Sequence, residues 1–407
     1  MKTVVAVVFG GRSVEHEISV ISALQAINAF DPEKYQVVPV YISKNGKWYT
    51  GKDLLDISNY KDTKALEAKC EEVFLKPIYG DFKLYRTNPK NGLFSKQDPV
   101  VADLHIVFPI LHGSHGEDGM FQGILETIGI PFVGCDTLSS ANGMDKITMK
   151  MILAESGIPV VNYVWFTDRE WLSNREKTDL MVEENLGYPV IVKPANLGSS
   201  VGISKASDRS QLDSAIENAI RFSSRIIVEE MVENMMEINC SVLGDADMRQ
   251  ASVCEEPISH KDFLTYDEKY GGGGATKGGV KGTKGTKQRS TGMQASQKKI
   301  PADLPEKVSA KIQQIACDTF RVLACNGVSR IDFMIDKTND NIYVNEINTI
   351  PGSLSYYLWE ETGISFQDLI DRLIALALKR KRDIDRKTFS YDTNIFALSA
   401  GNAGTKS

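Results

Sequence analysis

The 407-residue chain lacks a Cys-x-x-Cys pair, and none of its histidines has the spacing of a zinc site. Its six cysteines are spread widely between Cys70 and Cys325, which favours reduced thiols over disulfide bonds. No apolar run approaches the roughly 18 to 20 residues that a membrane-spanning helix requires. The first residues run directly into an apolar segment without a signal-peptide cleavage site. We therefore expect a cytoplasmic protein without disulfides, zinc or a membrane span.

A strong excess of one charge is also missing. The formal net charge is −6, so the sequence gives no reason to expect nucleic acid or an anionic membrane as a partner. Hydrophobic residues make up 42% of the chain, which is enough for packed cores. The length indicates about two to three domains.

The order strand, glycine-rich turn, helix occurs twice in the first third of the chain. Strands are expected at 4–9 and 104–111, turns at Gly10-Gly11 and His112-Gly-Ser-His-Gly-Glu-Asp-Gly119, and helices at 18–30 and 120–128. In a doubly wound sheet such turns lie at the carboxyl ends of the strands, where ligands bind. We predict an α/β fold whose N-terminal domain is doubly wound and Rossmann-like, followed by a linker at 137–143.

The middle of the chain contains a second kind of loop. A predicted buried strand at 188–193 is followed by the small residues 194–202, and a further strand at 226–230 ends in two glutamates. Small residues let backbone N–H groups turn toward a phosphate, and Lys193 adds a positive charge. The alternative is an ordinary hairpin turn, because glycine and serine are common in turns.

Four polar side chains are predicted to face one pocket from a β-hairpin. Arg330 and Asp332 lie on one strand, and Glu346 and Asn348 lie on the next, across a turn at 337–341. Residues two apart on a strand face the same side. The three oxygen ligands suit Mg²⁺, which leaves part of its coordination shell to phosphates and water. The alternative is a solvated hairpin face with ordinary charges.

The segment 271–299 differs in composition from the rest of the chain, because glycine, threonine and lysine dominate and acidic residues are absent. Such a segment cannot bury enough apolar surface to offset its chain entropy. We interpret it as a mobile loop whose positive charge favours closure over phosphates, with a solvated insertion as the alternative. Helices are expected at 301–325 and 366–379, and the tail 380–407 is expected to be disordered.

Several of these motifs together resemble those of the ATP-grasp enzymes. They are Met144-Asp-Lys146, Val190-Ile-Val-Lys-Pro194, Gly198-Ser-Ser-Val-Gly202, Ile227-Val-Glu-Glu230, Arg330-Ile-Asp332 and Asn345-Glu-Ile-Asn348. More narrowly, the chain is similar to the D-alanine–D-alanine ligases in Phe9-Gly-Gly-Arg-Ser-Val-Glu-His-Glu-Ile-Ser19, in the turn from His112 to Gly119, in Phe263-Leu-Thr-Tyr-Asp-Glu-Lys-Tyr270 and in Asn348-Thr-Ile-Pro-Gly352. The resemblance extends over about residues 1–378 and leaves out the lysine-rich loop and the tail.

The resemblance implies a three-domain ATP-grasp architecture. Its parts would be an N-terminal substrate-binding domain at 1–138, a small central domain at 139–227, a C-terminal domain at 228–380 with a mobile lid and basic insertion at 260–299, and a disordered tail at 381–407. The implied enzyme joins two D-alanines through an acyl phosphate, releases ADP and phosphate, and serves peptidoglycan precursor synthesis. The family also implies ATP, two Mg²⁺ ions (with Mn²⁺ as an alternative metal) and a homodimer.

The resemblance assigns residues to ATP and its metal ions. The phosphates would contact Lys146 and Lys193. Further nucleotide contacts would come from Ser200, from Glu229 or Glu230 at the adenine, from Glu237 at the ribose and from Lys269 at the transferred phosphate. The metal ligands would be the three hairpin residues Asp332, Glu346 and Asn348.

The resemblance also assigns residues to the two amino acids. The first D-alanine would present its ammonium group to Glu15, which would form a hydrogen-bonded set with Ser199 and Tyr270, and His112 would be a further substrate contact. Arg330 and the backbone N–H of Gly352 would stabilise the tetrahedral oxyanion. Many family members bind the carboxylate of the second substrate with a serine at the position of Tyr357. Here the tyrosine hydroxyl or Ser355 would substitute, beside Leu358.

Two other functions stay open. One is the same chemistry with D-serine or D-lactate as the second substrate, against which the intact pair Lys269-Tyr270 argues. The other is a nucleotide-binding module without catalysis, against which the complete metal ligands and Arg330 argue. For Glu15, the alternative is an acid that is favoured only by the dipole at a helix N-terminus.

Overall fold

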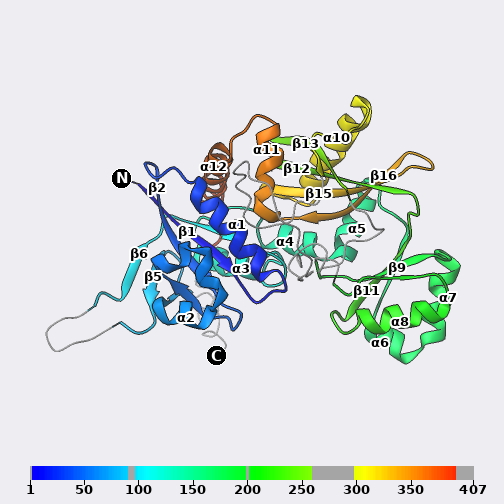
Figure 1. The fold of residues 1–407 in the computed structure, drawn as a ribbon, viewed down its shortest axis with the longest axis horizontal. Helices are drawn as coiled ribbons and strands as arrows, with labels where there is room; N and C mark the ends of the chain where they lie inside the picture. Colours follow the sequence, from blue (N-terminus) through cyan, green and yellow to red (C-terminus); the bar gives the residue numbers. More distant parts are fainter. Residues whose placement is uncertain (1, 90–96, 199–200, 259–297, 391–407) are drawn as a thin grey trace, which may run out of the picture.

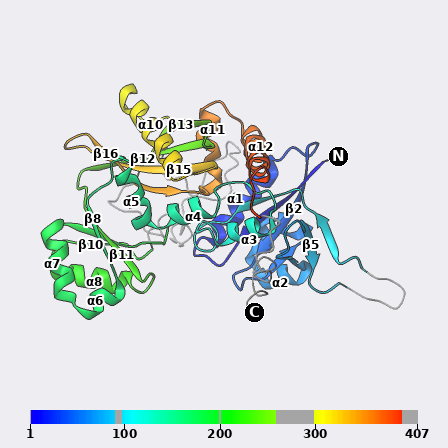
Figure 2. The same ribbon diagram turned by 180° about the vertical axis from the view of Figure 1, so that it is seen from behind.

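The computed structural model describes residues 2–89, 97–198, 201–258 and 298–390. They form three β-sheets with helices packed against them. Figure 1 shows the N-terminal sheet and the smallest sheet toward opposite ends of the long axis, with the third sheet above and between them; Figure 2 shows the same arrangement from behind. Within the described ranges, the helices are too short or too polar to traverse a bilayer.

The N-terminal sheet has seven strands in the order β6-β5-β4-β3-β2-β1-β7. The central strand β1 is parallel to both of its neighbours. Its side chains alternate between two cores, with Val5 and Val7 on one face and Ala6 and Val8 on the other, which explains its continuous apolar run. The strands are β1 (Thr3–Gly10), β2 (Tyr35–Ile42), β3 (Trp48–Thr50), β4 (Glu71–Leu75), β5 (Lys83–Arg86), β6 (Val100–Asp103) and β7 (Ile106–Ile110).

Helices cover this sheet as the sequence predicts for a doubly wound domain. They are α1 (His16–Ala29), α2 (Thr63–Lys69) and α3 (Met120–Ile128), with the 3-10 helices η1 (Lys52–Leu55) and η2 (Ile57–Lys61). The glycine-rich turns after β1 and β7 therefore lie at the carboxyl ends of two adjacent parallel strands. This is the edge of the sheet at which we expect substrate contacts.

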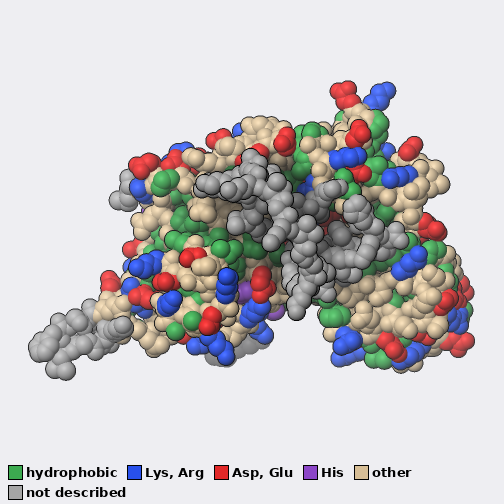
Figure 3. All heavy atoms as spheres, viewed as in Figure 1, with side chains coloured by type: hydrophobic (Ala, Val, Ile, Leu, Met, Phe, Trp, Pro, Cys, Tyr) green, Lys and Arg blue, Asp and Glu red, His purple; other side chains and the backbone are tan. Residues whose placement is uncertain are grey.

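The second sheet is small and antiparallel, in the order β10-β9-β11-β8. Its elements are β8 (Tyr163–Thr167), α6 (Asp168–Ser173), α7 (Arg175–Asn185), β9 (Val190–Pro194), β10 (Ser204–Ala206), α8 (Arg209–Ala219) and β11 (Arg225–Glu230). One core, which includes Trp171, Val192 and Ile216, joins the sheet to its helices. Figure 3 shows acidic and basic side chains interspersed over this lobe.

The third sheet has the order β14-β13-β12-β15-β16. Its strands are β12 (Met235–Gly244), β13 (Arg249–Pro257), β14 (Lys298–Lys299), β15 (Gly327–Asp336) and β16 (Asn341–Asn348). The helices α5 (Lys146–Glu155) and α10 (Glu306–Val322) share a core with it through Leu153 and Phe320. The chain then forms η3 (Gly352–Ser355), α11 (Tyr356–Glu361) and α12 (Phe366–Asp385). Residues of α12 such as Leu369 and Leu373 share a core with Val5 and Phe108 of the N-terminal sheet.

Two expectations from the sequence are wrong in detail. The segment expected to be a linker forms the helix α4 (Thr137–Met144) instead, because Asp136 and Ser139 make a reciprocal capping box at its start. The expected C-terminal disorder starts too early, because α12 continues to Asp385. Arg380 fixes this last part by donating to the carbonyl oxygens of Phe132 and Gly134. Its charge suggested an exposed tail, because composition cannot tell a half-buried arginine from an exposed one.

Candidate active site

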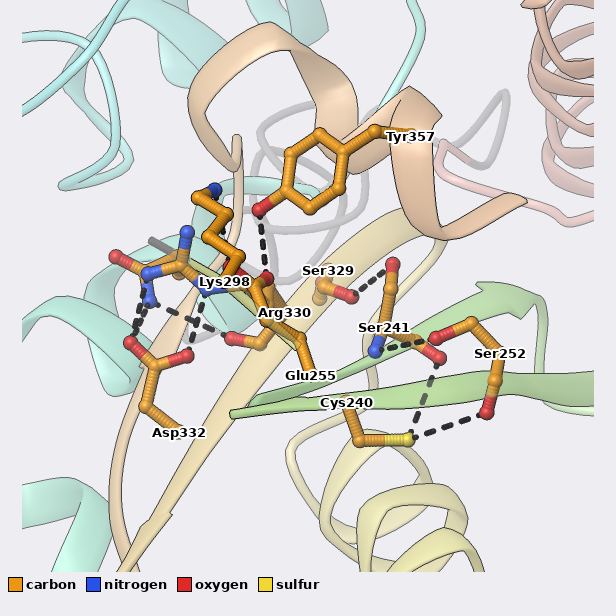
Figure 4. Close-up of polar contacts among 10 residues, drawn as sticks. Cys240, Ser241, Ser252, Glu255, Lys298, Ser329, Arg330, Asp332 and Tyr357 are labelled. Carbon is orange, nitrogen blue, oxygen red and sulfur yellow. Dashed lines mark hydrogen bonds and ion pairs between the residues drawn. The ribbon is translucent and has the colours of Figure 1, made fainter. Parts of the chain in front are cut away.

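The β15–β16 hairpin brings its four polar residues together as predicted. Arg330 lies opposite Asn348 and Asp332 lies opposite Glu346 in the strand register. Nε and Nη2 of Arg330 each donate to one oxygen of Asp332 at 2.7 Å. Nδ2 of Asn348 donates to Asp332 Oδ2 at 3.0 Å. Figure 4 shows the paired fork of Arg330 and Asp332 at one end of the cluster.

Two lysines from outside the third sheet reach this hairpin. Lys146 begins α5, whose N-cap Asp145 accepts from Thr148 N. Nζ of Lys146 lies 3.4 Å from Glu346 Oε2 and donates to Leu197 O at 2.9 Å. Nζ of Lys193, on β9, donates to Asn345 Oδ1 at 3.2 Å. The two lysines and the hairpin oxygens therefore line one space between the second and third sheets.

Glu229 forms a buried cluster with two lysines. Its carboxylate lies 2.6 Å from Nζ of Lys193 and 3.2 Å from Nζ of Lys150, and its side chain is only 2% exposed. Burial by itself would raise the pKa of Glu229, but the two ammonium groups lower it to about 2. Burial lowers the pKa of Lys150. The ionised form of Glu229 is thus strongly favoured.

Glu229 and Glu230, the two alternatives predicted for the adenine contact, differ in their environments. Glu229 forms ion pairs with the two lysines, whereas Glu230 is exposed and accepts a hydrogen bond from Nδ2 of Asn162 at 2.8 Å. Lys150 is not among the site residues predicted from the sequence. Its spacing from Lys146 indicates it, because residues four apart on one helix share a face.

Glu15 lies where three loops meet. It is the N-cap residue of α1 and is half-buried. A Cβ atom placed on Gly113 would lie 2.5 Å from Glu15 Oε2, and one placed on Gly198 would lie 3.3 Å from it. Both loops therefore need glycine to approach the carboxylate. The turn after β7 and the loop after β9 converge on Glu15, as a substrate site at the sheet edge requires.

His112 and Glu117 tie the same turn to the loop after β16. Nδ1 of His112 lies 2.8 Å from Ile350 O, and Nε2 lies 2.9 Å from Ser22 Oγ. Burial lowers the pKa of His112 to about 4, so the ring is neutral at pH 7. Both ring nitrogens of His112, expected to contact substrate, are thus engaged within the protein.

Glu117 accepts from the backbone N–H groups of Gly113 and Ile350, at 2.8 Å each. Burial, followed by the charge of Glu15, raises the pKa of Glu117 to about 8. No role for Glu117 is predicted from the sequence, although it lies inside the motif from His112 to Gly119. Its two hydrogen bonds hold the N-terminal turn against the third sheet.

The turn that follows Gly352 has an unusual backbone. Ser353, Leu354 and Ser355 have φ of 52°, 55° and 51°, a left-handed conformation that side chains disfavour. Ser355 is fully buried, and its hydroxyl has no hydrogen-bond partner among the described residues. The side chain of Leu358 is also fully buried. These two side chains therefore face the interior.

Tyr357 is bound to a residue that the sequence analysis did not single out. Its hydroxyl donates to Glu255 Oε2 at 2.9 Å, and Nζ of Lys298 lies 2.9 Å from Glu255 Oε1 (Figure 4). The tyrosine hydroxyl thus has a protein carboxylate as its partner, and its contact to a substrate carboxylate stays a prediction. No motif marks Glu255 or Lys298, because the strand register alone brings them to this site.

Of the remaining predicted site residues, the structure describes only Glu237. Glu237 is half-buried on β12 and lies opposite Met334 of β15. Ser199, Ser200, Lys269 and Tyr270 lie outside the described residues, as does nearly all of the expected lid and insertion.

The three sheets and the lysine-lined hairpin are those of an ATP-grasp enzyme. Residues 4–135 match the family description "D-ala D-ala ligase N-terminus", and residues 152–375 match "D-ala D-ala ligase C-terminus". The chain belongs to the D-alanine–D-alanine ligase family.

Individual relatives agree over nearly the whole length. The D-alanine–D-alanine ligase of Thermosipho melanesiensis is 40% identical over 397 residues, which cover 98% of this chain and 99% of the relative. That of Acetivibrio thermocellus is 38% identical, covering 93% of this chain and 96% of its own. The solved D-alanine-D-alanine ligase from Coxiella burnetii is similar with a TM-score of 0.75 at 30% identity, covering 95% of this chain and 96% of that one. The VanG D-Ala:D-Ser ligase from Enterococcus faecalis is similar with a TM-score of 0.74 at 30% identity, covering 93% and 100%.

Proposed function

We propose that this protein uses ATP to join two D-alanines into D-alanyl-D-alanine. The proposal rests on the contacts of Lys146 and Lys193 with the oxygen-rich hairpin. It is supported by D-alanine–D-alanine ligases that this chain matches over nearly its whole length. The reaction would take place in the cytoplasm, where it supplies a peptidoglycan precursor, and the enzyme would be a homodimer.

The hairpin oxygens fit a hard divalent cation. Asp332 and Glu346 face each other across two strands with Asn348 beside them, and Nζ of Lys146 lies 3.4 Å from Glu346. The position thus already attracts a positive charge in the protein alone. Asp332, Glu346 and Asn348 would hold Mg²⁺, which neutralises polyphosphate charge when bound.

The chemistry needs two steps. A carboxylate oxygen of the first D-alanine attacks the γ-phosphorus of ATP, the bond to ADP breaks, and an acyl phosphate forms. The amine nitrogen of the second D-alanine then attacks the acyl carbon, loses a proton, and phosphate leaves. Glu15 would hold the ammonium group of the first D-alanine. Arg330 and the N–H of Gly352 would stabilise the oxyanion in the second step.

A second candidate is the same reaction with D-serine as the acceptor. The similarity to a D-Ala:D-Ser ligase favours it, as does Tyr357 at a position where the family commonly has serine. Both candidates share the first step and differ only in the acceptor.

Product analysis distinguishes these functions. Purified protein is incubated with ATP, Mg²⁺ and D-alanine, alone and with D-serine or D-lactate, and products are identified by mass while ADP is measured. We expect D-alanyl-D-alanine in equal amount to ADP. A product containing D-serine at comparable concentrations would favour the second candidate, and an absence of both product and ADP would indicate a non-catalytic module.

A further inference from the structure

Lys298, Glu255 and Tyr357 form a charged cluster beside the proposed reaction site, which we call the Lys298 cluster. They come from three elements, β14, β13 and α11. Glu255 lies at the centre: its Oε1 is 2.9 Å from Lys298 Nζ, and its Oε2 is 2.9 Å from the Tyr357 hydroxyl. Nζ of Lys298 also lies 4.1 Å from the centre of the Tyr357 ring. Figure 4 shows the three side chains converging next to Arg330.

The strand register sets this cluster on the catalytic face of the third sheet. Asn239 of β12 lies opposite Glu255 on one side and opposite Asp332 on the other, and Asp332 lies opposite Glu346. Residues opposite one another share a face of the sheet. Glu255 is therefore in one row with the two proposed metal ligands. It is two strands from Asp332, a backbone separation of about 10 Å.

Lys298 is the part of this cluster that can bind an anion. Glu255 is 1% exposed, and a carboxylate buried to this degree requires a cation. Lys298 supplies it, yet its side chain remains 36% exposed. An ammonium group has three N–H donors, and Glu255 uses one of them. Of its neighbours, Tyr357 donates its hydroxyl to Glu255, and Arg330 holds Asp332 through Nε and Nη2.

We propose that Lys298, oriented by Glu255 and Tyr357, binds the carboxylate of the acceptor amino acid and makes the second subsite selective for an amino acid over an uncharged amine. This inference rests on the proposed function, because it assigns the carboxylate of the second substrate to a cation that lies against the Tyr357 ring. Lys298 would thus bind the carboxylate that a serine hydroxyl binds in relatives with serine at position 357. Glu255 and Tyr357 are positioning residues in this arrangement.

Lys298→Met tests the proposal, because methionine keeps most of the side-chain length and removes the charge. Two acceptors are compared with D-alanine as the phosphorylated substrate: D-alanine itself, and hydroxylamine, which lacks a carboxylate and gives D-alanyl hydroxamate. We expect the KM for acceptor D-alanine to rise about 10- to 100-fold, the equivalent of one charge-assisted hydrogen bond. The ratio of dipeptide to hydroxamate should fall by a similar factor.

A third acceptor, D-alaninamide, isolates the carboxylate. The unmodified enzyme should prefer D-alanine to D-alaninamide, and Lys298→Met should lose most of that preference. Lys299→Met is the matched control. Lys299 is the other residue of β14, and its Nζ lies 3.5 Å from Glu256 instead of Glu255. This variant should keep the ratio of dipeptide to hydroxamate.

Three results would overturn the inference. One is an unchanged acceptor KM in Lys298→Met. Another is an equal loss with hydroxylamine and D-alanine, which would place Lys298 in the first step or in folding. The third is a loss of acceptor binding in Glu255→Gln but not in Lys298→Met, since the carboxylate would then bind the acceptor's amine. Failure of the unmodified enzyme to form any hydroxamate from D-alanine would instead refute the proposed function.

Discussion

Nζ of Lys193 lies 2.6 Å from Oε2 of Glu229, although both side chains are almost completely buried. Taking two charges from water is costly, so such a pair is stable only when each charge is well compensated. Here Lys150, on the other oxygen at 3.2 Å, adds a second cation. The cluster therefore carries an excess of positive charge at the place where we propose that the ATP phosphates bind.

Glu229→Gln should destabilise the protein by about 3 to 5 kcal/mol, because it leaves Lys150 buried without a counter-charge. The measurement is the free energy of unfolding in denaturant. Glu230→Gln is the control, since the neighbouring glutamate is exposed and should change stability by less than about 0.5 kcal/mol. Similar stabilities for the two variants would mean that the buried cluster is neutralised in another way.

Acid should remove the stability that ionised Glu229 provides. The pKa of Glu229 falls from 4.5 to about 2 on folding, so its contribution is complete above about pH 4.5 and is lost as the pH falls toward 2. The full effect is on the order of 3 kcal/mol. Unfolding free energies of the unmodified protein and Glu229→Gln should therefore converge in acid. A difference that stays constant from pH 6 to pH 3 would contradict this.

Glu117 should have the opposite pH dependence. Burial and the charge of Glu15 raise the pKa of Glu117 from 4.5 to about 8, so its neutral form is favoured by folding. Its contribution is complete below pH 4.5 and is lost as the pH rises through about 8. The unfolding free energy should fall over this range in the unmodified protein and less so in Glu117→Gln. In Glu15→Gln the loss should be smaller and should end at a lower pH, because a charge that raises the folded-state pKa of Glu117 is gone.

Glu346→Gln should reduce kcat with little effect on folding. Its side chain is 29% exposed, and a lost charged metal ligand costs on the order of several kcal/mol in transition-state stabilisation. We expect kcat to fall at least about 100-fold, with a higher Mg²⁺ concentration needed for half-maximal rate. Turnover is measured against Mg²⁺ concentration, and circular dichroism checks the fold. Near-normal turnover would mean that Glu346 does not bind the metal.

Glu15→Gln should raise the KM for the first D-alanine more than that for ATP. The lost partner is an ammonium group, and a charge-assisted hydrogen bond is worth about 1.5 to 3 kcal/mol, or roughly 10- to 100-fold. Glu17→Gln is the control, because Glu17 lies in the first turn of the same helix and pairs with exposed Lys44. Equal weakening of both substrates in Glu15→Gln would indicate a structural role.

Local patterns in the sequence identified much of the fold. The apolar run at 4–9 predicted the strand β1. The hairpin of Arg330, Asp332, Glu346 and Asn348 followed from the alternation of side chains along a strand. The small polar residues at 137–143 led to the wrong prediction of a linker, because Ser139 is part of the capping box that starts helix α4. The same residue types favour caps and loops, so composition cannot separate the two.

The sequence by itself thus determined many of the elements, the glycine turns, the hairpin with its four polar side chains and the family resemblance, since each depends on residues close together in the chain. Only the tertiary structure decided which charges meet across the chain. It paired Lys150 with Glu229 and Lys298 with Glu255, and it brought Glu117 between two loops. These pairs depend on the register of strands and on packing between domains, which no local spacing encodes. They are also buried or half-buried, so their energies depend on an environment that exists only after folding.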